Sequence, residues 1–292
     1  MCGGRGHHGA GSLCLGDLGY EKGRIKTFRD AVVDLDALVD TGLLKSDHYL
    51  HLRCELPAAD MLELFEPVAD HRLVRMISLM DHSAGVGQYA NLDAYRKQRR
   101  DEGLGEAEIE ARIVRMTHAR ATFGPPNRAA LLARTAGLDV TLASHDDRTE
   151  AEVAQNFADG IRISEFPVSL EAARAAHARG MQTIAGAPNI VRGGSHSGNV
   201  RAADLIRAGV VDALASDYVP AALVEAAFLA VGQAGISLPA AVALVTDTPA
   251  RMARLTDRGR IAAGLRADLV RVRTLGDLAV VRQVWHRGER VA

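Results

Sequence analysis

A chain of 292 residues, 48% of them hydrophobic, is long enough for one large barrel-type domain or two ordinary domains. Its 35 Lys and Arg residues balance 36 Asp and Glu residues, which excludes a general basic field for nucleic acid and requires any phosphate site to be local. No apolar run reaches the roughly 18 to 20 residues that span a bilayer, and no signal peptide begins the chain. Three cysteines without close spacing argue against a disulfide framework, so we expect a cytoplasmic protein with no membrane contact.

From about residue 48 onward, short apolar segments that end in polar residues alternate with helical patterns, which is typical of βα units around a parallel sheet. Strands are expected at residues 48–56, 72–82, 139–147, 160–166, 182–189 and 213–218, with helices at 150–158, 169–179 and 202–207. Residues 93–122 carry mixed charges at helical spacing, as in solvated helices of an inserted cap. A capped helix at 246–255 and a hairpin-like run at 283–291 predict a small β subdomain at the end. The whole pattern predicts a (β/α) barrel.

Polar side chains lie at the carboxyl end of each predicted strand, where barrel enzymes place their chemistry. They are Glu55, Asp81, His82, His145, Asp146, Glu165, Asn189 and Asp217. Taken singly, Asp81, Asp146 and Ser169 are better explained as helix N-caps, and a lone histidine as a buried, hydrogen-bonded one. Together, two imidazoles and several carboxylates around one opening suit a divalent zinc, iron or manganese ion.

Residues 185–199, AGAPNIVRGGSHSGN, combine backbone flexibility, positive charge and hydrogen-bond donors. Arg192 offers a planar donor fork, and Gly193 and Gly194 would let the backbone approach a ligand closely. Ser195 and the polar residues after it add donors suited to phosphate oxygens. The segment therefore predicts an anion-binding loop, although a solvated surface loop can have a similar composition.

The segments HLRCE, SLMDHSAGVGQY, ASHDD, SEFPVS, AGAPNIVRGGSHSGN and LASDYVP follow one another over residues 40–292. In this order they resemble the amidohydrolase superfamily, and within it the PhnM-type enzymes of phosphonate breakdown. The resemblance implies a (β/α)8-type amidohydrolase barrel. It also implies hydrolysis of α-D-ribose 1-methylphosphonate 5-triphosphate to the 5-phosphate and pyrophosphate. A phosphorylated small molecule of this kind would account for the anion-binding segment.

Carried over position by position, the resemblance implies a divalent metal, with zinc favoured over manganese or iron. Its ligands would be Glu55, His82, His145 and Asp217, and Asp217 would also be the catalytic base for the attacking water. His196 is expected either as a ligand or as a phosphate contact. The implied substrate contacts are Asn189, Arg192, Gly193, Gly194, Ser195, His196, Ser197 and Asn199.

The family's first barrel strand, with its His-x-Asp or His-x-His pair, finds no match in this chain, whose first residues begin near the second strand. We therefore expect an incomplete hydrolase barrel over residues 1–255 and a remnant of the small β subdomain over 256–292. A fragment, or a partner chain that supplies the strand, stays open, as does a homo-oligomer. Two other functions also stay open: an amidohydrolase acting on a C–N bond, such as a deaminase or cyclic amidase, and a non-catalytic phosphate-ligand binder.

Overall fold

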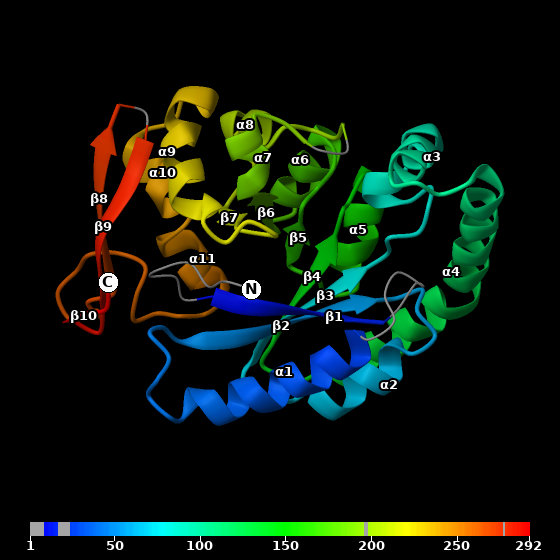
Figure 1. Ribbon diagram of the computed structural model, residues 1–292, viewed down its shortest axis with the longest axis horizontal. Helices are drawn as coiled ribbons and strands as arrows, with labels where there is room; N and C mark the ends of the chain where they lie inside the picture. The colour runs from blue at the N-terminus through cyan, green and yellow to red at the C-terminus, as the bar shows by residue number, and fades with distance from the viewer. Residues whose placement is uncertain (1–8, 17–23, 196–197, 277) are drawn as a thin grey trace.

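A curled parallel sheet forms the centre of the molecule, as Figure 1 shows for the computed structural model, which describes residues 9–16, 24–195, 198–276 and 278–292. Its seven strands lie side by side in chain order. They are β1 (Gly9–Leu15), β2 (His48–Glu55), β3 (Val74–Met80), β4 (Thr141–His145), β5 (Ile163–Glu165), β6 (Gln182–Gly186) and β7 (Ala213–Ala215). Among the described residues β1 pairs only with β2, and β7 only with β6, so the sheet is a half-barrel. The predicted α/β class with a barrel-type parallel sheet is confirmed, in the form of a half-barrel of seven strands.

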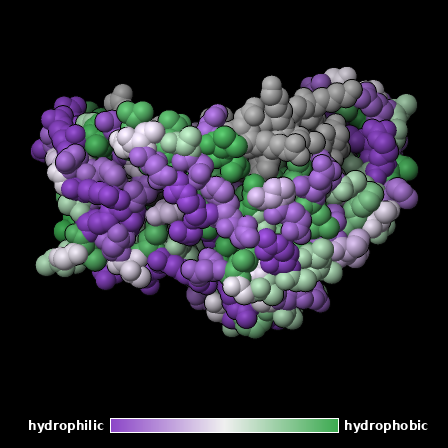
Figure 2. Space-filling view, turned by 90° about the horizontal axis from the view of Figure 1, so that it is seen from below, coloured by the Kyte–Doolittle hydropathy of each residue, from purple (hydrophilic) through white to green (hydrophobic). Residues whose placement is uncertain are grey.

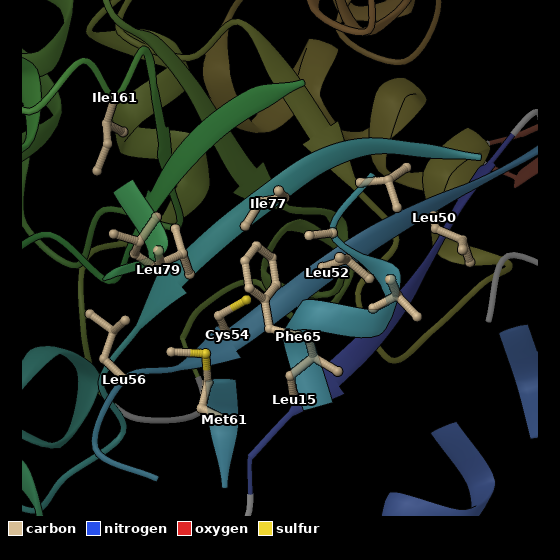
Figure 3. Close-up of a cluster of buried hydrophobic side chains, with 14 of the residues drawn as sticks. Leu15, Leu50, Leu52, Cys54, Leu56, Met61, Phe65, Ile77, Leu79 and Ile161 are labelled. Atoms are coloured by element: carbon tan, nitrogen blue, oxygen red, sulfur yellow. The ribbon is translucent and has the colours of Figure 1, made fainter. Parts of the chain in front are cut away.

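The alternation of side chains along β2 explains how the sheet is placed. Leu50, Leu52 and Cys54 are buried in the main hydrophobic cluster on the outer face of the sheet. Figure 3 shows them with Met61 and Phe65 of the short helix α2 (Met61–Phe65), which packs against the strand. Because side chains alternate along a strand, His51, Arg53 and Glu55 point to the other face, into the half-barrel. The polar side of this strand therefore faces the interior.

Helices connect successive strands and cover the outer face of the sheet, as expected for right-handed βα crossovers. They are α1 (Arg24–Val39), α5 (Glu150–Ala158), α6 (Leu170–Ala178), α7 (Ala187–Arg192), α8 (Ala202–Arg207), α9 (Ala222–Ala234), α10 (Leu238–Ala243) and α11 (Asp247–Met252), with a 3-10 turn η1 at Glu66–Val68. The predicted helices at 150–158, 169–179 and 202–207 are confirmed as α5, α6 and α8. Thr149 closes a capping box with Glu152 at the start of α5, and Ser169 caps α6.

Between β3 and β4 the chain forms a two-helix insertion, α3 (Leu92–Asp101) and α4 (Glu106–Thr135), which confirms the helices expected at 93–122. It follows a 3-10 turn, η2 (Gly87–Tyr89), and occupies one end of the molecule in Figure 1. A small hydrophobic cluster joins Tyr89 of η2 to Tyr95 of α3 and Met116 of α4. The insertion therefore packs directly behind the loop that follows β3.

The end of the chain forms a three-stranded antiparallel sheet of β8 (Leu269–Leu275), β9 (Leu278–His286) and β10 (Glu289–Arg290), in which the predicted hairpin-like run is confirmed. Figure 2 shows a largely hydrophilic surface at this end of the molecule. Asp47, just before β2, holds this region to the half-barrel: its carboxylate accepts hydrogen bonds from Arg258 at 2.6 Å, Arg266 at 2.5 Å and Arg287 at 3.5 Å. Across the described ranges, none of the helices is long and apolar enough to cross a membrane.

Candidate active site

A cavity of about 310 Å³ opens at the carboxyl ends of the parallel strands. Its lining brings together residues from β2, from the ends of β4 and β7, and from the connections after β3 and β6. These include Arg53, Gln88, His145, Asp146, Arg192 and Asp217. In parallel α/β barrels the carboxyl ends of the strands carry the functional site, so this cavity is the candidate active site.

His82 is held in one orientation by Glu55. The backbone N–H of His82 donates to Glu55 Oε1 at 2.8 Å, and its Nδ1–H donates to Oε2 at 2.6 Å. Burial opposes charge on both groups, but their mutual attraction prevails: it raises the pKa of His82 and lowers the pKa of Glu55. With Nδ1 used in this way, Nε2 of His82 is the nitrogen left for coordination.

His145 is held from below by a buried hydrogen-bonded network. Its Nδ1–H donates to Glu165 Oε2 at 2.8 Å, and the same oxygen accepts from Ser78 Oγ at 2.9 Å. Ser78 in turn contacts Nε2 of His51 at 2.5 Å. Burial lowers the pKa of His51 to about 4, which favours its neutral form. The network therefore fixes the ring of His145 and directs its Nε2 toward the cavity.

Glu165 is the buried charge at the centre of this network, with 3% of its surface exposed. Burial opposes its ionisation, but His51, His145 and Arg53 together hold the pKa of Glu165 well below its usual range. Since a carboxylate oxygen accepts two donors, Glu165 can hold His145 and Ser78 at once.

Asp146 lies beside His82 and His145 and has a left-handed backbone conformation. Its φ is +58°, and its Oδ2 is buried with no hydrogen-bond partner among the described residues. Gly87 of η2 lies against it: a Cβ at that glycine would come within 2.9 Å of the Asp146 Cβ. A strained, buried carboxylate without a donor points to a ligand as its partner.

His82, His145 and Asp146 each offer a ligand atom within 4.8 Å of the others. Two imidazole nitrogens and a carboxylate oxygen are the donors that zinc, manganese and iron prefer. Asp146 Oδ2 is also the buried acceptor that lacks a protein donor. The residues present therefore fit a divalent metal ion, which at His145 Nε2 would take the place of the hydrogen bond that Arg53 Nη2 donates there at 3.2 Å.

Arg53 brings a positive charge into the same cavity. Its Nη2 donates to His145 Nε2 at 3.2 Å, and its Nε contacts the sulfur of Met80 at 3.2 Å. Burial opposes its charge, but Glu165 and the more distant carboxylates of Asp217 and Asp146 raise its pKa. Arg53 is thus a permanent cation at the base of the cavity.

Asp217 lies at the cavity mouth, two residues after β7, with a φ of +48°. It is exposed, and it stands outside the three-residue cluster of His82, His145 and Asp146. The next residue, Tyr218, accepts a hydrogen bond from Arg192 Nη2 at 3.1 Å through its hydroxyl oxygen. The ends of β7 and α7 therefore meet at the rim.

The glycine-rich segment after β6 differs from the predicted continuous loop, because residues 187–192 form the helix α7. Pro188 lies in its first turn, and Gly193 ends it with a φ of +81°, a conformation that favours glycine. A Cβ at Gly193 or Gly194 would meet nothing within 4 Å, so the turn at the end of α7, rather than close approach to protein atoms, accounts for Gly193.

The remaining predicted substrate contacts separate into three groups. Arg192, Gly194, Ser195 and Asn199 line the cavity. Asn189 also lines it, but its side chain is engaged with the backbone: Oδ1 accepts from the Ala202 N–H at 3.0 Å, and Nδ2 donates to the Val200 carbonyl at 3.4 Å. His196 and Ser197 lie outside the described residues.

Of the predicted residues, His145 and Asp217 line the cavity. His82 lies beside His145, with 5.2 Å between the two ring centroids, and Glu55 holds His82 in place. Asp146, treated from sequence as a helix cap, instead joins the metal-type cluster, since the cap of α5 is Thr149. The sequence signal for this role of Asp146 was its position directly after His145. Arg53 was not among the predicted site residues, and nothing in its spacing indicates a contact with a histidine of β4.

No protein-family model matches the chain. A protein of Escherichia coli (strain K12), alpha-D-ribose 1-methylphosphonate 5-triphosphate diphosphatase, is 40% identical to it over 283 residues, which is 96% of this chain and 75% of that protein. The chain belongs to this diphosphatase family.

Two solved structures share the architecture of this chain. N-acetylglucosamine-6-phosphate deacetylase of Pasteurella multocida aligns with a TM-score of 0.55 at 12% identity, over 97% of this chain and 75% of its own. The Thermotoga maritima enzyme of the same name aligns with a TM-score of 0.51 at 13% identity, over 96% and 77%. At such identities the likeness shows a shared fold alone.

Proposed function

We propose that this protein is a metal-dependent hydrolase that cleaves α-D-ribose 1-methylphosphonate 5-triphosphate into the 5-phosphate and pyrophosphate. The family to which the chain belongs gives the substrate class. The single structural observation that carries the proposal is that one cavity is lined both by His145 and Asp146 of the metal-type cluster and by the segment that carries Arg192. A phosphoric anhydride needs both, because charge builds on the attacked phosphoryl group and on the departing pyrophosphate.

His82, His145 and Asp146 would hold the divalent ion, with zinc favoured and manganese or iron as alternatives. A divalent ion bound there supplies positive charge for the phosphoryl oxygens and makes a nearby water more acidic. Glu55 and Glu165 orient the two histidines through their Nδ1 atoms. Both glutamates would then act on the reaction through the histidines.

Asp217 is proposed as the base that accepts a proton from the attacking water. It lines the same cavity as His145 and Asp146 of the cluster, and as a carboxylate at the rim it can pass the proton to solvent. Arg192, Ser195 and Asn199, with the backbone around Gly193 and Gly194, would hold the phosphate oxygens of the leaving pyrophosphate. Arg53 would contribute positive charge from the base of the cavity.

The product pattern tests this proposal. The chain is loaded with zinc or manganese, desalted and incubated with the triphosphate, and phosphorus NMR follows the products. We expect pyrophosphate and the 5-phosphate in equal amounts. Stepwise release of orthophosphate, or no turnover with either metal, would contradict the proposed cleavage.

Replacing the proposed base separates its role from metal binding. Asp217→Asn is expected to lower kcat at least about 100-fold, the usual contribution of general base catalysis, while the metal content stays near that of the unchanged chain. Asp212→Asn is a matched control, because Asp212 lies outside the cavity lining and its Oδ2 accepts a hydrogen bond from the Thr183 N–H at 2.8 Å. Full activity of Asp217→Asn would rule out Asp217 as the base.

A further inference from the structure

The loop between β3 and α3 forms a wall of the cavity that has not been given a role so far. It contains the turn η2, and its residues Gln88 and Tyr89 line the cavity. In the sheet, β3 and β6 are separated by β4 and β5. The β3–α3 loop therefore enters the cavity from a different side than the segment that carries Arg192.

Several contacts fix this loop in place. The N–H of Ser83 donates to Asp81 Oδ1 at 3.0 Å, and the other oxygen of Asp81 accepts from Arg120 of α4 at 2.5 Å. Within the loop, the Tyr89 N–H donates to the Val86 carbonyl at 2.8 Å. A loop that is bonded internally and tied to a helix can present its side chains in one arrangement.

Gly87 sets how close the loop comes to the metal-type cluster. Its φ is +50°, and no larger residue fits there without moving Asp146, since a Cβ would lie 2.9 Å from the Asp146 Cβ. The residues that follow Gly87 therefore enter the cavity next to the reacting groups. Tyr89 is held by an edge-to-face contact with Tyr95 at 5.4 Å and by the guanidinium of Arg99 at 5.9 Å.

Gln88 is the neutral polar group on this wall. Its side-chain amide makes no hydrogen bond to any residue in the described part of the chain, although the side chain is partly buried in the cavity lining. A primary amide offers two donors and one acceptor without charge. It is therefore suited to hydroxyl groups, whereas the phosphates are better matched by Arg192 and Arg53.

We propose that Gln88 recognises the sugar part of the substrate by hydrogen-bonding adjacent ring hydroxyls, and so determines specificity for sugar triphosphates over bare triphosphate. This inference rests on the proposed function for its substrate class. The neutral wall of Gln88 and Tyr89 then holds the ring, while the cationic groups hold the phosphate chain. Gln88 contacts the substrate away from the bond that breaks.

Equilibrium binding tests the proposal independently of turnover. Because the active chain would consume its substrate, calorimetry is done on metal-loaded chains that carry Asp217→Asn, with and without the Gln88 substitutions. It measures the dissociation constants of three ligands: α-D-ribose 1-methylphosphonate 5-triphosphate, its 2-deoxy counterpart and inorganic triphosphate. Gln88→Ala is expected to weaken binding of the ribose compound about 10- to 100-fold, because ring hydroxyls lose their partner, and to change binding of inorganic triphosphate less than about twofold. The variant should also no longer distinguish the ribose compound from the 2-deoxy compound.

Two further variants test whether the effect comes from the hydrogen bonds of Gln88. Gln88→Met keeps the length of the side chain without its hydrogen bonds and should behave like Gln88→Ala. Gln98→Ala is the matched control, since the side-chain amide of Gln98 on α3 donates to Glu102 at 3.3 Å and Gln98 does not line the cavity. If the Gln88 variants bind all three ligands more weakly by the same factor, or bind all three as tightly as the unsubstituted chain, the proposed role of Gln88 is wrong.

The outcome for Gln88 is separable from that for the proposed function. Selective weakening in a chain that releases no pyrophosphate would support Gln88 as the sugar contact and contradict the diphosphatase activity. Pyrophosphate release by the unchanged chain, with no change of ligand selectivity in Gln88→Ala, would support the diphosphatase activity and contradict Gln88 as the sugar contact. If the unchanged chain binds none of the three ligands, both proposals are wrong.

Discussion

Replacing Glu165 by Gln should weaken metal binding without removing any metal ligand. Both the Nδ1–H of His145 and the hydroxyl of Ser78 donate to one oxygen of Glu165, at 2.8 and 2.9 Å. A glutamine oxygen at this place can still accept both bonds, so the substitution removes the negative charge and little of the shape. The comparison therefore isolates the electrostatic contribution of the carboxylate.

Two magnitudes follow from this geometry. Loss of a carboxylate that orients a metal-binding histidine typically lowers metal affinity 10- to 100-fold, which corresponds to about 1.4 to 2.7 kcal/mol. The metal-free chain should also lose about 3 kcal/mol of unfolding free energy, because Arg53 loses a buried counter-charge. We take the lower end of the range for a broken buried pair, since Asp146 and Asp217 still act on the charge of Arg53.

The two quantities are measured separately. Competition with a chromophoric chelator gives the zinc affinity, and guanidinium unfolding of the metal-free chain gives the stability. Glu108→Gln is the matched control, because Glu108 is exposed at the start of α4. If Glu165→Gln keeps zinc affinity within about twofold of the unchanged chain, Glu165 does not orient a metal ligand.

Two other substitutions test the loop at Asp146 and the anchor of the C-terminal sheet. Gly87→Ala and Gly85→Ala should each cost about 1 to 2 kcal/mol of unfolding free energy, since both glycines have positive φ. Only Gly87→Ala should also lower kcat, about 10-fold or more, because its Cβ would displace Asp146, whereas a Cβ at Gly85 meets nothing closer than 3.7 Å. Equal kcat values for the two variants in a pyrophosphate assay would contradict this. Burial opposes ionisation of Asp47, but hydrogen bonds from Arg266 and Arg258 hold the pKa of Asp47 well below the usual 3.8. The ionised carboxylate therefore stabilises the folded chain fully above pH 3.8, and this stabilisation declines as the pH falls below 3.8. Asp47→Asn should therefore cost about 2 kcal/mol near neutral pH and less near pH 3, whereas the exposed Asp139→Asn should cost little at either; a pH-independent loss in guanidinium unfolding would refute the linkage.

The order of strands and helices could be predicted from the sequence, because each βα unit has its own apolar pattern and turn. β2 spans residues 48–55 against a predicted 48–56, and α5 spans the predicted 150–158. The helix α7 was missed, although Pro188 near its start and Gly193 at its end are ordinary helix signals. The glycines and polar residues of that segment drew the interpretation toward a loop.

The partners within the cavity could not be predicted in the same way. Strand alternation places Glu55 and Arg53 on the inner face of β2, but their contacts depend on the curl of the sheet. That curl brings Glu55 to His82 and Arg53 to His145, which is 92 residues away along the chain. Gln88 was equally hidden, because nothing in a single sequence distinguishes a glutamine in a cavity wall from one on the surface.

The anchor at Asp47 also has a consequence for how the chain is made. Its partners Arg258, Arg266 and Arg287 lie 211, 219 and 240 residues further along the chain. Neighbouring strands of the parallel sheet can pair one after another as they leave the ribosome, but Asp47 meets the first of these partners only after a further 211 residues have been made. Until then the early part of the half-barrel is held by its own packing alone, and the segment that carries Arg258, Arg266 and Arg287 later fixes the start of β2 in place.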